Sequence, residues 1–93
     1  MSQRDIDVDE DELYQFIQVL EAFQSLTQDR FRAVSEAWKK VNESWQGESK
    51  KQFAGQYEVT EMSVDATLKA GKDALMWLEQ FDEIVKKFER DYR

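Results

Sequence analysis

The sequence predicts an all-α fold: an antiparallel helix–turn–helix hairpin that forms a single domain over residues 1–93. Three observations lead to this prediction. The 93-residue chain has no Pro, it has only three Gly, and its apolar residues recur at helical spacing on both sides of one break. Pro interrupts a helix interior because it lacks an N–H and clashes with the preceding turn, so its absence is typical of long helices. A chain of this length forms one domain at most.

The first helix is expected over about residues 9–45. Its apolar residues fall every three or four positions, the pattern of one helical face. They form two seven-residue series, Leu13, Leu20, Val34 and Val41 on one and Ile17, Phe31, Trp38 and Trp45 on the other. This spacing lets a helix lie along a neighbour at a small crossing angle. The polar residues Gln24, Thr27 and Arg30 weaken the stripe in the middle.

The turn is expected at residues 45–48, where Trp45-Gln46-Gly47 breaks the pattern. Gly adopts the left-handed conformation that commonly ends a helix, so Gly47 is predicted to end the first helix. Ser49, with Gln52 three residues later, matches a capping box, in which a side chain at each end of the motif satisfies a free backbone N–H. Ser49 is therefore predicted to begin the second helix.

The second helix is expected over about residues 49–90. Its apolar stripe consists of Phe53, Tyr57, Val64, Leu68, Leu75, Leu78, Phe81, Val85, Phe88 and Tyr92. Gly55 and Gly71 lie inside it, and each costs about 1 kcal/mol relative to Ala, so close contact with the first helix is expected at both. A short turn forces the helices antiparallel. The acidic residues within 5–12 should then lie beside the basic residues within 86–93.

Several apolar residues lie beside these stripes: Phe16, Phe23, Met62, Met76, Trp77 and Ile84. Because burying a large apolar side chain stabilises by about 1.5–3 kcal/mol, we expect a second hairpin, either another copy or a similar chain, to cover them in a four-helix bundle. The alternative is that they widen the stripe within one hairpin. The predicted bundle core is Leu13, Leu20, Phe31, Val34, Trp38, Val41, Phe53, Tyr57, Val64, Leu68, Leu75, Leu78, Phe81 and Val85.

Composition argues against several classes of function. The net charge of −7 and the lack of a basic stripe disfavour nucleic-acid binding. No apolar run approaches the roughly 20 residues of a membrane span, and the start has no apolar segment of the signal-peptide type. The chain has no His and no Cys, and no strained turn presents a Ser nucleophile. We therefore expect no catalytic, metal or cofactor site.

The turn carries a motif. Trp45 and Gly47 are followed by Ser49 two positions after the Gly and by Phe53 four further on. Because this W-x-G motif lies mid-chain, at the only break between two long predicted helices, the chain resembles the WXG family. These are the small ESAT-like helical hairpins of bacterial type VII secretion. The resemblance covers the whole chain. It implies a non-enzymatic protein that folds in the cytoplasm and is secreted without a signal peptide, or that acts as partner or adaptor for a larger effector. It also implies that Trp45 and Gly47 form a recognition turn.

One part of the family pattern is missing. Many members carry Y-x-x-x-D/E just after the second helix, but Tyr92 is followed only by Arg93. Tyr57 and Glu61 have the right spacing, yet they lie early in the second helix, where packing explains them better. Either a partner chain supplies this signal or the protein is an adaptor. The alternative function is a cytoplasmic helical-hairpin chaperone or scaffold that is not itself secreted.

Overall fold

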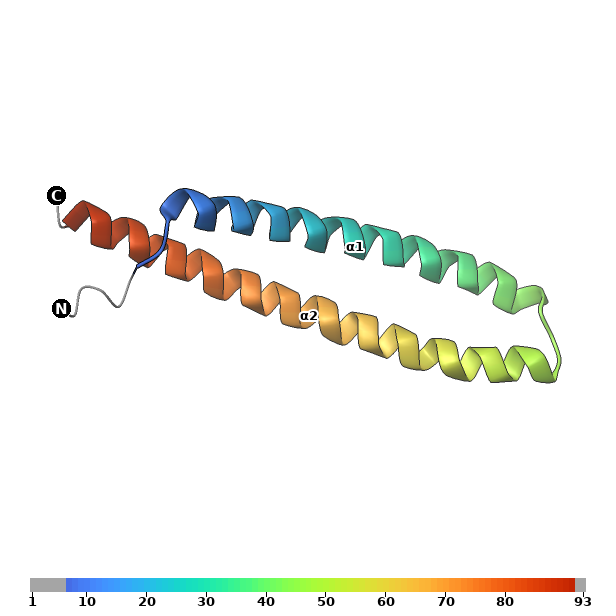
Figure 1. Ribbon diagram of the computed structural model, residues 1–93. Coiled ribbons are helices and arrows are strands. Elements are labelled where there is room, and N and C mark those ends of the chain that lie inside the picture. The colour runs from blue at the N-terminus through green and yellow to red at the C-terminus, as the bar shows by residue number, and fades with distance from the viewer. Residues whose placement is uncertain (1–6, 92–93) are drawn as a thin grey trace.

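The computed structural model describes residues 7–91, which contain two α-helices and no strand. Helix α1 is Glu10–Ser44 and helix α2 is Glu48–Asp91. Figure 1 shows the two helices side by side and antiparallel, with a short turn at one end; α1 begins and α2 ends at the other, which we call the terminal end. The predicted all-α fold of two long helices is confirmed. The predictions that involve residues 5 and 6, Tyr92 and Arg93 lie outside the described residues.

The hairpin is an extended rod. It measures 68 × 20 × 15 Å and its radius of gyration is 20.5 Å, against roughly 12 Å for a compact domain of this length. A rod of two helices has one layer only. Each helix can therefore bury one stripe against the other helix, and its remaining surface faces outward.

Helix α1 begins with a capped and acidic first turn. The side chain of Asp9 accepts a hydrogen bond from the Glu12 backbone N–H at 3.0 Å, which satisfies one of the free donors at a helix start. Glu10, Asp11 and Glu12 follow in the first turn, where negative charge interacts favourably with the helix dipole. The acidic start thus has a local structural role in α1.

The turn differs from the prediction in two respects. Helix α1 ends at Ser44, and its C-cap is Trp45, which has an extended backbone and donates its N–H to the Val41 carbonyl at 2.9 Å. Gly47 does have a positive φ of 108°, but it lies immediately before α2 and does not end α1. The prediction of a glycine-terminated α1 is therefore wrong, because the chain leaves α1 through an extended Trp45.

The predicted capping box at the start of α2 is also wrong. Helix α2 begins at Glu48, so Ser49 already lies inside the first turn. The Gly47 carbonyl accepts a hydrogen bond from the Lys51 N–H at 3.3 Å and so starts the helical pattern. The chain, with a positive φ at Gly47, enters α2 two residues before Lys50, the first helical residue that a cap at Ser49 would give.

The best-buried side chains lie toward the terminal end of the rod. Four are aliphatic residues of the predicted stripes, with Leu20, Leu78 and Phe81 packed around them. Their exposed fractions are 8% for Leu13, 6% for Ile17, 8% for Leu75 and 2% for Val85. The aliphatic core thus lies at the terminal end of the hairpin and the W-x-G turn at the other.

Candidate functional site

Four aromatic side chains gather at the turn end of the hairpin. The Trp38 ring lies 5.2 Å from both the Phe53 and the Tyr57 ring, measured between centroids, and 6.5 Å from the Trp45 ring. Trp45 in turn lies 5.8 Å from Phe53. Trp45 of the W-x-G turn therefore packs against the start of α2. This packing accounts for its presence structurally, whatever further role it has.

The aromatic cluster also borders an apolar groove. Val34, Ala37 and Val41 of α1 line it together with the four rings, and its volume is about 340 Å³. Three side chains predicted as core are exposed here in the hairpin: Val34 at 47%, Val41 at 46% and Phe53 at 42%. One hairpin alone leaves them uncovered.

The exposure of Val34 and Val41 follows from helix geometry. A straight helix with 3.6 residues per turn drifts by about 20° per heptad relative to a strict seven-residue series. Toward the turn, Val34 and Val41 have rotated away from α2, and Ser35 occupies the contact instead. Its Oγ lies 3.4 Å from the Tyr57 hydroxyl. The series from Leu13 to Val41 therefore faces α2 at the terminal end and turns away from it at the turn end, where Trp38 and Trp45 of the other series keep the contact.

The other predicted core residues do face the partner helix. Leu13, Leu75 and Val85 are buried. The half-buried members are Leu20, Phe31, Trp38, Tyr57, Val64, Leu68, Leu78 and Phe81. The contact between the helices is thus continuous along the rod, although most of its side chains keep part of their surface exposed.

One flank of the hairpin carries most of the exposed apolar side chains, and we call it the apolar face. On α1 its stripe reads Glu12, Phe16, Val19, Phe23, Leu26, Arg30, Ala33, Ala37 and Lys40. Its alternating steps of four and three carry it gradually around the helix, by about 20° per heptad. On α2 it reads Phe53, Gln56, Thr60, Ser63, Thr67, Ala70, Ala74, Trp77, Phe81, Ile84 and Phe88. Between residues 53 and 88, this stripe of α2 holds no charged residue.

Of the fourteen exposed large apolar residues, seven lie on the apolar face: Phe16, Val19, Phe23, Leu26, Phe53, Trp77 and Ile84. Val34 and Val41 lie directly beside it, which brings the total to nine. Trp77 is 62% exposed and stacks on Phe81, with ring centroids 5.4 Å apart. Because each side chain leaves about half of its surface uncovered, the face offers on the order of 700 Å² of apolar surface. Monomeric proteins rarely leave so large a patch in contact with water.

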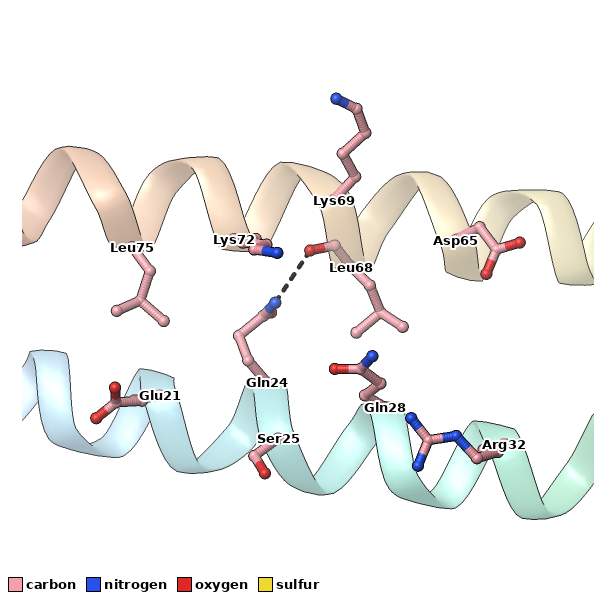
Figure 2. Close-up of a pocket in the computed structure, with 10 residues that line it drawn as sticks. All are labelled: Glu21, Gln24, Ser25, Gln28, Arg32, Asp65, Leu68, Lys69, Lys72 and Leu75. Atoms are coloured by element: carbon pink, nitrogen blue, oxygen red, sulfur yellow. Dashed lines mark hydrogen bonds between the residues drawn. The ribbon is translucent and has the colours of Figure 1, made fainter.

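The opposite flank, the polar face, carries most of the charges. Figure 2 shows an open groove there, in which Glu21, Gln28 and Arg32 of α1 line one side and Asp65 and Lys72 of α2 line the other. A second groove, nearer the termini, includes Glu79 and Glu83. The two flanks thus differ sharply in chemistry.

Two of the six apolar residues that were expected beside the main stripes do not share the apolar face. Met62 is 67% and Met76 51% exposed, but both lie on the α2 stripe that includes Lys69 and Glu83. Phe16, Phe23, Trp77 and Ile84 do share the apolar face. All six are more than half exposed, so they do not widen the contact between the two helices.

A polar contact at the middle of the hairpin was not anticipated. The Gln24 side-chain amide donates a hydrogen bond to the Leu68 carbonyl at 3.0 Å (Figure 2). The same amide fills the space that a Cβ at position 71 would need, so Gly71 permits the contact. The expectation for Gly71 is confirmed. For Gly55 it is wrong, because nothing lies within 4 Å of a Cβ built there. Gln24 thus contributes a specific contact where the sequence indicated only a weak stripe.

Asp82 is a buried carboxylate that the sequence did not single out. It is 7% exposed, and its Oδ2 lies 3.1 Å from Lys86 Nζ. Its Oδ1 is buried and has no hydrogen-bond partner among the described residues. A hydrogen bond and the charge of Asp82 raise the pKa of Lys86. The ion pairs within residues 7–88 each lie inside one helix, so none of them joins the acidic residues within 7–12 to Lys86 or Lys87.

The described residues contain no group of three or more acidic, His or Cys side chains that could hold a metal ion. Neither described helix is long and apolar enough to cross a membrane. Within this part of the chain, the apolar face and the aromatic turn are the features that suggest a function.

Comparisons with known protein families, with curated proteins and with solved structures found no match to this chain. The resemblance to the WXG family therefore rests on the residues of the turn and on the hairpin layout.

Proposed function

We propose that this chain is a non-enzymatic helical-hairpin protein whose apolar face packs on a second hairpin to form a four-helix bundle. The observation that carries the proposal is the apolar face itself, with nine exposed large apolar side chains on or beside one flank. Packing two hairpins face to face would cover this surface, and bundles of four antiparallel helices are a common solution. The area of on the order of 700 Å² is close to the roughly 800 Å² per partner of a standard protein interface.

We further propose that the bundle is a substrate, co-secreted partner or effector adaptor of a bacterial type VII secretion system. The support is the position of Trp45 and Gly47 at the break between two long helices, with Phe53 packed beside Trp45. On this proposal the protein folds in the cytoplasm and leaves the cell without a signal peptide. The recognition turn would be Trp45 and Gly47.

Export of a Trp45→Ala variant tests this role. We expect a folded, helical protein that reaches the culture medium in smaller amounts than the wild type, with a cytoplasmic marker excluding lysis. Met62→Ala is the matched control, since Met62 is exposed and lies away from both the turn and the apolar face. Its export should equal that of the wild type.

Two results would count against the secretion role. Normal export of folded Trp45→Ala would mean that Trp45 serves only to pack the turn. Retention of the wild-type protein inside cells with an active type VII system would favour the cytoplasmic chaperone or scaffold. Neither result would bear on the bundle, which native mass measures separately.

A further inference from the structure

The apolar face has one charge at its centre. Helix α1 runs from Glu10 to Ser44, so its midpoint is residue 27, and Arg30 lies one turn beyond it. Arg30 follows Phe23 and Leu26 on the same stripe. The other charges of the stripe, Glu12 and Lys40, lie near its two ends.

Arg30 has no counter-charge within the part of the chain that the structure describes. The neighbouring Asp29 pairs with Arg32 on the other flank, with Nη1 and Oδ1 3.4 Å apart. No ion pair involves Arg30 among the described residues. Along α2 the facing stripe is uncharged over residues 53–88. The guanidinium is therefore compensated by water alone, and covering the face removes that water.

When two copies of this chain pack with their rods in full overlap, the second copy places no acidic residue of its apolar face beside Arg30. In a parallel symmetric pair, the two Arg30 residues lie at the same level. In an antiparallel pair centred on residue 27, they lie roughly 9 Å apart along the helix axis, since each is three residues from the centre at about 1.5 Å per residue. If α1 packs on α2 of the other copy, Arg30 meets uncharged residues around Ala70. At the ends, by contrast, an antiparallel copy places Glu12 near Lys40.

We infer that the preferred partner of the apolar face is a different helical hairpin, one that carries an acidic residue at the middle of its own apolar face. This inference rests on the proposed bundle. A charged group that loses water without a counter-ion is costly, whereas a hydrogen-bonded Arg–carboxylate pair is compensated and fixes the register. Like charges at an interface disfavour the wrong partner, so Arg30 selects against self-association.

The test uses the Arg30→Glu chain as the probe for such a partner. Sedimentation equilibrium would measure the dissociation constants of the wild type alone, of Arg30→Glu alone and of their equimolar mixture. We expect the mixed pair to associate at least about tenfold more tightly than either chain with itself. A mixture of wild type with Arg32→Glu is the matched control, because Arg32 lies on the polar face, and it should gain nothing.

Different outcomes separate this inference from the bundle itself. If the wild type pairs with itself as tightly as with Arg30→Glu, the bundle stands and the selection of an acidic partner is overturned. If a gain of the same size appears with Arg32→Glu, net charge explains the effect and the inference is again overturned. If no sample associates at any soluble concentration, both proposals fail.

Discussion

The two ends of the hairpin reach very different degrees of burial with the same kind of apolar stripe. At the terminal end, Val85 is 2% and Ile17 6% exposed. At the turn end, Val41 and Phe53 remain 46% and 42% exposed beside an aromatic groove. The two helices therefore bury the aliphatic residues that face each other at the terminal end, whereas Val41 and Phe53 beside the groove stay about half exposed. The turn end has apolar surface that this hairpin leaves uncovered.

Val85→Ala and Val41→Ala form a matched pair that tests this difference in burial between the two ends. Val85→Ala removes buried methyl groups and should lower the free energy of unfolding by about 2 kcal/mol. Val41→Ala should lower it by less than about 0.5 kcal/mol, because the site is exposed and Ala favours helix. Urea unfolding followed by circular dichroism, at a concentration where the chain is monomeric, measures both. Equal losses would contradict the difference between the ends.

The contact between Gln24 and Gly71 lies between the two ends and can be tested by a double-mutant cycle. Gly71→Ala should raise the free energy of unfolding by about 1 kcal/mol through helix propensity. It should also lower it by about 1 kcal/mol, because the Gln24 amide is displaced from the Leu68 carbonyl, so the two effects cancel in the wild type. In a Gln24→Ala background, the same substitution should therefore stabilise by about 1 kcal/mol.

Gly55→Ala is the control for this cycle. Nothing lies within 4 Å of its added Cβ, so it should stabilise by about 1 kcal/mol in either background. A Gly71→Ala effect that does not depend on Gln24 would mean that the amide contact does not constrain the hairpin.

The smallest effect is expected at the Asp82–Lys86 pair near the termini. The folded protein raises the pKa of Lys86 above its ordinary value of 10.5, mainly through the hydrogen bond and charge of Asp82. The pair therefore stabilises fully below about pH 10.5 and loses this contribution as the pH rises through the folded-state pKa. Lys86→Gln should lower the urea midpoint slightly at pH 8 relative to Lys87→Gln, and the difference should shrink above pH 11. A constant difference would contradict the charge interaction.

The sequence predicted the two helices because their periodicity is local information. It predicted the stripe at the terminal end for the same reason. It misplaced the roles of Gly47 and Ser49, since Trp45 leaves α1 with an extended backbone and its ring packs on Phe53 of α2, a contact that the local pattern does not show. It placed Val34 and Val41 in the core of a bundle. In the single hairpin they are exposed, because a seven-residue series drifts around a straight helix, and their place in a bundle stays a prediction.

The candidate site was predicted in part. Phe16, Phe23, Trp77 and Ile84 were expected beside the stripes, and they do lie on one face. The grouping of Met62 and Met76 with them failed, because spacing along one helix does not say which flank adjoins the other helix. Arg30 could be recognised as unpaired at the middle of the apolar face only once both helices were placed.

Native mass by light scattering tests the central claim, that the apolar face is a protein interface, most directly. At rising concentration the wild-type chain should shift from its monomer mass of 11.1 kDa toward twice that value. Trp77→Asp, on the apolar face, should remain monomeric, while Met62→Asp should behave as the wild type. A wild type that stays monomeric both alone and when mixed with Arg30→Glu, or a Trp77→Asp chain that still dimerises, would contradict the claim.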